Sequence, residues 1–470
     1  MPNRESSHHS SGIRFGAKSA VVAVVVCVAV YFITLADLQR TLKHSLNRLH
    51  AAGVPMTWAE TAPGPVPDQD NAGVLYEQAL AGLRVSRQES QLMGRFAQGD
   101  APGDLGALRR DVERIIANDQ AALQLLKQGA RRSHCRFTLS EAVMLSPGDY
   151  KVLTALRMCG DLLAADAVGA AYRGDTKEAI AACRTALRLS EHAAYPDVSY
   201  FCSGARMRIR AMHALRQVLE QTELDSNTCG SLFRQLQASD LNAALRAATY
   251  NDAYRVLWRF EAVELQPDQA RLLLADARDA WHVIRISWGA RLYLSPLAKQ
   301  LRLKEEIVRI GLMEQDLALI EKPYRDLKRQ WPALRQRYDR LPRYYMMPSG
   351  PLSGPEVALL RDCAIAESSA MQVTLALKDY RAKHGAYPDS LDALRADLGG
   401  VGAAPEMRRS RIQGWKLPQD PFSGKTFAYR RKGAGFVLYS WGEDLDDDGG
   451  RPNDPWRYPA DGDMVWEYLR

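Results

Sequence analysis

The chain has 470 residues, and its charge is nearly balanced, with 62 lysines and arginines against 55 aspartates and glutamates. Nothing in this balance calls for a nucleic-acid partner, and none is expected. The length allows two or three domains. The seven cysteines form no C-x-x-C pair and no zinc-type spacing, so most of them are interpreted as small buried thiols.

An apolar segment follows the polar N-terminal tail, residues 1–18. The run from Ser19 to Leu35 contains no charge, and its 17 residues would form roughly 25 Å of helix, close to the thickness of a bilayer core. We predict an uncleaved transmembrane signal anchor over residues 19–36. A cleavable signal peptide is the alternative, but the cleavage site at residues 34–36 is poor, and an amphipathic sequence continues beyond it. The bulk of the chain would then be extracytoplasmic, held by a single pass in the inner (cytoplasmic) membrane.

The middle of the chain is predicted to be helical. Residues 37–70 are expected to form a juxtamembrane helix and a proline-rich linker, and residues 71–345 have helical periodicity almost throughout. The segment Val168–Glu191 resembles the helical hairpin of a tetratricopeptide repeat. Such a single hairpin is more often ordinary helix packing than a peptide-binding array. Helices are expected at 105–128, 150–172, 204–221, 230–246, 268–286 and 300–320.

Catalytic motifs are absent from this helical region. It has no nucleophile elbow, Walker loop or dinucleotide-binding glycine pattern. The carboxylates Glu261 and Glu264 could form an acid–base pair, although such residues on a helix more often face solvent. Four histidines are widely separated in the sequence: His134, His192, His213 and His282. We therefore expect no catalytic residues, and we expect this region to bind a protein partner.

A glycine- and proline-rich linker, residues 346–355, precedes the last predicted domain, residues 356–470. A long helix is expected from Glu356 to about His384. Its apolar residues alternate steps of four and three, which produces one continuous stripe. Such a stripe must be covered, and a sheet is the expected cover.

The sheet is expected to be small and antiparallel. Residues 426–431 and 436–441 are predicted to form a β-hairpin, and residues 462–468 are predicted to return as a third strand. The predicted fold class is therefore mainly α: a single membrane helix, a helical bundle with a repeat-like hairpin, and a C-terminal α+β domain.

An acidic loop, residues 438–450, carries five carboxylates within six residues. Two like charges about 4 Å apart repel by roughly 1 kcal/mol in water and by about 4 kcal/mol at an effective dielectric constant near 20. An ordered loop therefore needs full solvation or a bound cation. Asp444, Asp446 and Asp448 stand at alternate positions of a D-x-D-x-D-G turn, which favours Ca²⁺. A solvated acidic turn is the alternative.

This turn is not a complete EF-hand. Pro455 stands where an EF-hand has its bidentate glutamate. The missing ligands would have to come from elsewhere, and the nearest candidates are Asp461 and Asp463.

The C-terminal motifs, taken in order, resemble the soluble domain of the major pseudopilin of type II secretion. The motifs are Gly-x-Tyr-Pro at 385–388, Leu-Pro-x-Asp-Pro-Phe at 417–422, Tyr-Ser-x-Gly-x-Asp at 439–444, and the aspartates Asp461 and Asp463. The resemblance implies a calcium site in the loop between the last strands. Its ligands would be Asp444, Asp461 and Asp463, with backbone carbonyls near Ser440. Asp446 and Asp448 would then be peripheral, so two arrangements are predicted, and both contain Asp444.

The N-terminal half departs from that family. Pseudopilins carry a glutamate at the fifth position of a membrane helix that continues into the domain helix. Here that position holds Val21, and about 320 residues separate the span from the domain helix. The whole layout resembles other membrane-anchored proteins with such a C-terminal domain.

From this layout we expect a membrane-anchored, non-catalytic structural or interaction protein with a calcium-stabilised domain. An accessory component of a type II secretion or pilus-like system is the alternative. The second alternative is an envelope-acting hydrolase with its site in the helical region, which would need Glu261, Glu264 or His282 to meet in a concave pocket.

Overall fold

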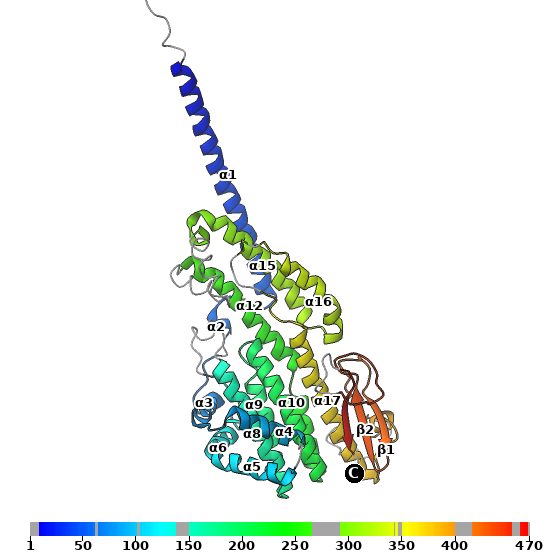
Figure 1. The fold of residues 1–470 in the computed structure, drawn as a ribbon. Helices are drawn as coiled ribbons and strands as arrows, with labels where there is room; N and C mark the ends of the chain where they lie inside the picture. The colour runs from blue at the N-terminus through cyan, green and yellow to red at the C-terminus, as the bar shows by residue number, and fades with distance from the viewer. Residues whose placement is uncertain are drawn as a thin grey trace, which may run out of the picture. The chain divides into compact units, whose positions relative to one another are not determined.

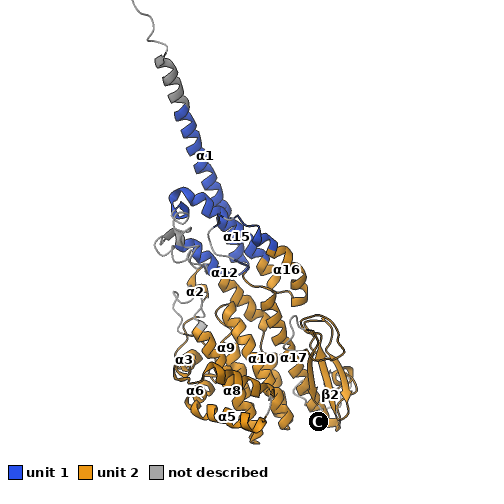
Figure 2. Cartoon of the chain, viewed as in Figure 1, with its two compact units in different colours: residues 1–56, 253–315, 336–351 blue, residues 57–252, 316–335, 352–470 orange. Residues whose placement is uncertain are grey.

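The protein is mostly helical, with an N-terminal apolar helix and a small antiparallel sheet near the C-terminus, which confirms the predicted fold class (Figure 1). The structure is a computed structural model, and it describes residues 9–61, 64–100, 104–137, 150–265, 292–342, 344–345, 350–399, 416–453 and 461–468. The chain forms two compact units (Figure 2). Unit 1 comprises residues 1–56, 253–315 and 336–351, and unit 2 comprises residues 57–252, 316–335 and 352–470.

Unit 1 is built around helix α1, His9–Ala51. From Ala20 onward this helix is long and apolar enough to cross a membrane, and its valines are more than half exposed over much of the predicted span. The helix continues without a break past that span, as the amphipathic sequence predicted. A short 3₁₀ helix, η1 (Pro296–Ala298), leads into α15 (Lys299–Ile320).

Helices α1 and α15 run alongside each other in the same direction. Gln300 donates from Nε2 to the carbonyl of Tyr31 at 2.7 Å. Farther along both helices, Arg48 Nε lies 2.9 Å from Glu314 Oε1. The contact farther along α1 is also the one farther along α15, so the two helices are parallel.

Several helices of unit 2 begin at well-defined caps. Ser86 forms a capping box with Glu89, and Asp197 and Asp225 accept hydrogen bonds from the first free backbone N–H groups of their helices. Besides α15, whose last residues belong to unit 2, the described helices that lie in unit 2 or extend into it are α2 (Trp58–Thr61), α3 (Ala72–Gly82), α4 (Arg87–Gln98), α5 (Leu105–Asn118), α6 (Gln120–Gly129), α8 (Tyr150–Tyr172), α9 (Thr176–His192), α10 (Val198–Gln221), α11 (Ser226–Gln237), α12 (Leu241–Leu265), α16 (Tyr324–Asp339), α17 (Pro355–His384) and α18 (Leu391–Gly399).

Several predicted helices match these bounds, and two do not. The predictions at 150–172 and 300–320 correspond to α8 and α15. The predicted helix at 230–246 is wrong, because Asp240 accepts from Asn242 N and Ala243 N and thereby starts α12 as a new helix. The prediction at 105–128 is likewise divided, at Asp119. The predicted helix at 268–286 lies outside the described residues.

Helices α8 and α9 pack against each other as the predicted hairpin. Gly174 takes a positive φ of 77° in the turn, a conformation that costs glycine little. Asp175 then caps α9 by accepting from Glu178 N at 3.0 Å. One hairpin does not establish an array, so the helical repeat stays a prediction.

The C-terminal sheet has the strand order β1 (Ala428–Lys432), β2 (Gly435–Ser440), β3 (Met464–Tyr468). Both pairings are antiparallel, and Phe436 lies between Arg431 on one side and Tyr468 on the other. This confirms the predicted hairpin and third strand. Phe436 and Leu438 are fully buried in the core that β2 shares with α17.

Helix α17 is covered on more than its sheet-facing side. It also packs against α10 and α11 of the helical region, in the same compact unit. Arg208 of α10 donates to Ser368 Oγ at 2.8 Å, and Lys378 of α17 donates to the carbonyl of Leu219 at 2.8 Å. The sequence predicted one apolar stripe on this helix, whereas the structure buries two faces of it.

The outer edge of β3 is occupied by a side chain of α10. Arg216 donates from Nη1 to the carbonyl of Val465 at 3.2 Å and from Nη2 to the carbonyl of Glu467 at 3.3 Å. These carbonyls point away from β2, so the guanidinium group takes the place of a fourth strand.

Candidate metal centre

The acidic loop connects β2 to β3 and folds back on itself. Gly449 and Gly450 have positive φ values of 69° and 83° and turn the chain there. After the turn, Asp463 N donates to the carbonyl of Arg451 at 2.8 Å, and Asn453 N donates to the carbonyl of Asp463 at 2.9 Å. This pairing carries the end of the acidic turn to the beginning of β3.

Three carboxylates meet where the loop closes. Asp444, Asp448 and Asp461 each offer one oxygen, and these oxygens lie within 4.8 Å of one another. All three side chains are partly buried. The group takes two members from the predicted D-x-D-x-D-G turn and one from the downstream aspartate pair, so it combines the two predicted arrangements.

Asp444 is fixed by two backbone groups. Gly462 N donates to its Oδ2 at 2.7 Å, and Asp446 N donates to its Oδ1 at 3.2 Å. Asp446 itself is exposed and accepts from Asp447 N at 2.9 Å. Its carboxylate is therefore used within the turn, outside the group of three.

Asp463, directly before β3, has only 1 % of its surface exposed. Its Oδ2 accepts from Gly450 N at 2.6 Å, while its Oδ1 is buried without a hydrogen-bond partner among the described residues. Burial raises the pKa of Asp463 above its usual range, and the charges of Asp447 and Asp448 raise it further. Buried oxygen atoms without a partner are rare, and a ligand is one explanation.

A second unsatisfied oxygen lies nearby in the chain. Oδ1 of Asn453 is also buried without a partner in the described part of the chain. Carboxylate and amide oxygens are the donors that Ca²⁺ prefers. The residues of this loop therefore fit a calcium ion better than a soft metal, which would select sulfur or imidazole ligands.

Arg451 supplies a positive charge to the same carboxylates. Its Nη2 lies 2.6 Å from Asp448 Oδ1 and 2.9 Å from Asp461 Oδ1. The hydrogen bonds that Arg451 donates to these two carboxylates raise its pKa above the usual range. The sequence analysis missed this residue, although an arginine directly after an acidic turn is a visible signal.

Ser440 is held by a residue that the sequence analysis also left out of the site. Its Oγ donates to Asp420 Oδ1 at 2.6 Å. Asp420 is buried and also accepts from Phe422 N and Ser423 N. The hydroxyl of Ser440 is thus committed to Asp420, which belongs to the Leu-Pro-x-Asp-Pro-Phe motif, and a backbone carbonyl remains the predicted contribution of this segment to a metal.

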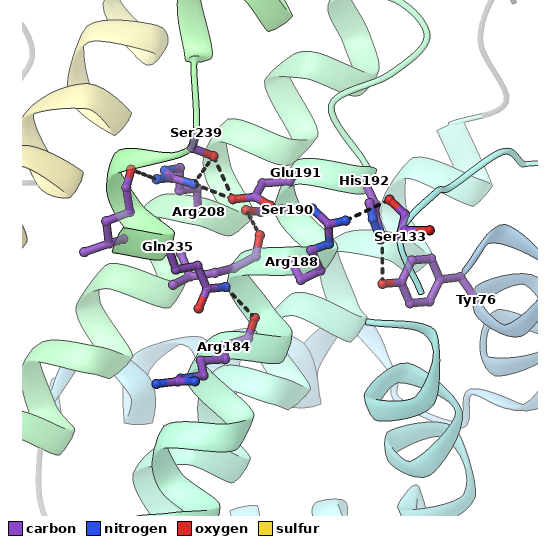
Figure 3. Close-up of polar contacts among 12 residues, drawn as sticks. Tyr76, Ser133, Arg184, Arg188, Ser190, Glu191, His192, Arg208, Gln235 and Ser239 are labelled. Carbon is purple, nitrogen blue, oxygen red and sulfur yellow. Dashed lines mark hydrogen bonds and ion pairs between the residues drawn. The ribbon is translucent and has the colours of Figure 1, made fainter. Parts of the chain in front are cut away.

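One histidine and several arginines inside the helical region form polar contacts with neighbouring helices and loops (Figure 3). His192 Nδ1 lies 3.0 Å from the hydroxyl of the fully buried Tyr76. Burial lowers the pKa of His192 to about 3, with Arg188 and His134 contributing in the same direction, so the ring is neutral at pH 7. Arg208 donates to Ser239 Oγ at 3.0 Å, and its charge is balanced by Glu191 at 3.5 Å.

Unit 1 contains Glu261, one of the two carboxylates of the predicted acid–base pair. Glu261 lies with Glu306, His50 and Trp258 on the wall of a hollow of about 480 Å³. The side chain of Glu264 and all of His282 lie outside the described residues. Their predicted meeting with Glu261 stays a prediction.

Comparison with known proteins identifies the C-terminal region. Residues 362–458 match the family described as type II secretion system (T2SS), protein G. The matched residues include most of α17, β1, β2 and the acidic loop, and they end before Asp461, Asp463 and β3. No curated protein and no solved structure matches the chain. The C-terminal region therefore carries a type II secretion protein G domain, the pseudopilin type that its motifs predicted.

Proposed function

We propose that this protein is a membrane-anchored accessory component related to type II secretion, and that it acts by binding protein partners rather than by catalysis. The observation that carries the proposal is the environment of α17, the helix of the protein G domain. This helix is packed between the sheet and the helices α10 and α11 of its own chain.

Helix α17 begins at Pro355, preceded by Gly354, which has an extended backbone. Proline suits the first turn of a helix, so this start is intrinsic to the sequence. The membrane-spanning candidate α1 is a different helix, which ends at Ala51. In pseudopilins, by the resemblance described above, the membrane helix and the domain helix are one continuous helix. The separation of α1 from α17 in this chain therefore supports a different use of the domain here.

The contacts of α17 with α10 also argue for docking rather than polymerisation. The Glu367 carboxylate accepts from Trp466 Nε1 at 2.8 Å and lies 3.2 Å from His213 Nε2. Two neighbouring molecules could not pack along this face of α17 without removing α10. Such a component would join a secretion assembly through surfaces other than the face of α17 that α10 covers.

We further propose that the acidic loop binds Ca²⁺ through Asp444, Asp448, Asp461 and Asp463. The cluster of carboxylate oxygens supports this, as does Oδ1 of Asp463, which has no partner among the described residues. When bound, the ion would neutralise the mutual repulsion of the carboxylates and close the loop between β2 and β3. Its role would be stability of the domain rather than chemistry.

The partner proposal is tested by crosslinking in cells that contain a type II secretion system. The full chain with a C-terminal affinity tag is crosslinked, purified from membranes and analysed by mass spectrometry. We expect pseudopilus or inner-membrane secretion components to be enriched over a control membrane protein with the same tag. Recovery of the folded chain from membranes without any such component would contradict the proposal.

The calcium proposal is tested by calorimetry on the full chain, because an isolated C-terminal domain would expose the face of α17 that α10 and α11 cover. Calcium binding is expected in the wild type and is expected to be lost in Asp444→Ala and Asp461→Ala. Asp446→Ala is the matched control, since this exposed carboxylate lies outside the cluster. Loss of binding in Asp446→Ala with retention in Asp461→Ala would instead indicate an EF-type turn.

A further inference from the structure

Two leucines of unit 1 are unusually exposed. Leu297 is 80 % exposed and Leu292 is 65 % exposed. Among the described residues outside α1, these are the most exposed large apolar side chains. Exposed leucines carry little meaning singly, but a pair that flanks one short turn defines an apolar surface.

This turn lies against the membrane-spanning candidate. Tyr31 donates from its hydroxyl to the carbonyl of Pro296 at 3.5 Å, and Gln300 donates to the carbonyl of Tyr31 at 2.7 Å. Tyr31 belongs to the uncharged run of α1, next to Phe32, which is 61 % exposed. Leu297 directly follows Pro296, so this exposed leucine lies close to the apolar surface of the span.

The position of Tyr31 along α1 indicates how deep in the bilayer the turn would meet the spanning helix. Asp37 is the first charged residue after the span, six residues beyond Tyr31. At 1.5 Å per residue, Tyr31 lies about 9 Å along the helix from Asp37, on the bilayer side. Apolar faces of interfacial segments are buried roughly 5–10 Å into the boundary between headgroups and acyl chains.

Several side-chain hydrogen bonds hold the turn in this conformation. Ser295 donates from Oγ to the carbonyl of Leu292 at 2.6 Å. Arg302, which is 9 % exposed, donates to the carbonyls of Tyr293 and Ser295, the latter at 3.0 Å. The buried hydroxyl of Tyr293 donates to Glu305 Oε2 at 2.7 Å. The bonds from Ser295 and Arg302 satisfy the carbonyls of Leu292, Tyr293 and Ser295 from within the protein. A carbonyl that is satisfied in this way can face lipid at a lower cost.

We propose that residues 292–298 form a second membrane contact, in which Leu292 and Leu297 insert into the boundary between lipid headgroups and acyl chains beside α1. The inference rests on the membrane anchor of the proposed function. Two attachment points would fix the rotation of α1 about its own axis and hold unit 1 against the bilayer, which a single spanning helix does not do.

The test uses the full chain in nanodiscs of phosphatidylcholine. A benzophenone amino acid is incorporated at position 297, and at position 292 in a second variant, and lipid adducts are measured by mass spectrometry after illumination. Ile33, which is 69 % exposed in the span, is the positive control position. Leu105, an exposed leucine of unit 2, is the matched negative control. The parent chain's thermal unfolding midpoint, retained in each variant, shows that folding is unchanged.

We expect lipid adducts at positions 297 and 292 in yields close to that at position 33 and severalfold above that at position 105. Adducts at position 33 alone would overturn the second contact and leave the anchor intact. Crosslinks from position 297 to protein instead of lipid would overturn it as well. Absence of lipid adducts at position 33 would show that the anchor itself is wrong, and the second contact would fail with it.

Discussion

Two buried carboxylates of the C-terminal region have opposite surroundings. Glu367 on α17 is 7 % exposed, and each of its oxygens has a partner, His213 for one and Trp466 for the other. Asp463, directly before β3, is 1 % exposed, and one of its oxygens has no hydrogen-bond partner among the described residues. Burial of an unpaired carboxylate oxygen is costly, whereas a fully paired one contributes to a specific structure.

The contrast separates a structural carboxylate from a candidate ligand. Burial alone would raise the pKa of Glu367, but the charge of His213, the hydrogen bonds from His213 and Trp466, and Arg216 outweigh it and leave the pKa below its usual range. For Asp463 the balance goes the other way, and its pKa is raised. The first site is complete within the chain, whereas the second leaves one buried oxygen without a partner among the described residues.

The largest expected effect is that of Glu367→Ala. The substitution leaves the buried Trp466 N–H and the His213 ring without their acceptor, and we expect a loss of about 3 kcal/mol in the free energy of unfolding. Chemical denaturation followed by tryptophan fluorescence measures it, with Asp446→Ala as the control. The contacts of Glu367 should be independent of the metal. If adding calcium restored the stability lost in Glu367→Ala, the distinction between Glu367 and Asp463 would be wrong.

A smaller effect is expected for Asp463→Asn, and only with calcium. At free calcium about 100-fold above its dissociation constant, binding stabilises a folded protein by about 2.7 kcal/mol. We expect this increment to vanish in the variant, while its melting temperature without calcium does not fall, since the ionised carboxylate is already disfavoured there. Thermal melting with and without EGTA measures both. A full calcium increment in Asp463→Asn would remove this residue from the site.

Acid should weaken the α17 contact. Because the pKa of Glu367 is lowered by folding, its contribution is present above the unfolded pKa of about 4.5 and is lost as the pH falls through the lower folded pKa. In Glu367→Gln the corresponding part of the pH dependence should be missing. Melting temperatures between neutral pH and about pH 3 test this, and identical pH profiles for both proteins would contradict it.

The smallest effect is expected for Arg451→Gln. The guanidinium group lies between Asp448 and Asp461 and would have to leave when a calcium ion takes their oxygens. We expect the variant to bind calcium severalfold more tightly, as measured by calorimetry. Weaker binding would mean that Arg451 supports the loop instead of competing with the ion.

The sheet-facing side of α17 could be predicted because its apolar residues follow the helical period. The burial of its polar residues could not be predicted in this way, since Arg361, Glu367 and Ser368 look like solvent-facing residues. They are buried because their partners come from remote segments. Arg361, for example, donates to the carbonyls of Ile320 and Lys322 at 2.6 and 2.7 Å. Such partners carry no periodic signal in the sequence.

The acidic loop shows the same limit at smaller scale. Its composition was enough to predict a cation site and to select Asp444. The grouping of Asp448 with Asp461 depends on the register between Pro452 and Asp463, which form a single bridge. No repeating pattern sets the register of one bridge. The break before α12 was missed for another reason, because Ser239 and Asp240 were read as part of a helix although aspartate is a common N-cap.

The arginine on the outer edge of β3 limits how this domain can meet another protein. A free strand edge offers a row of backbone groups to which an extended segment of a partner can add, and proteins often block such edges. Arg216 already occupies the carbonyls of Val465 and Glu467. Recognition by strand addition is therefore closed on this side of the sheet, and a partner here must read side chains, which makes the contact selective for sequence rather than for backbone shape.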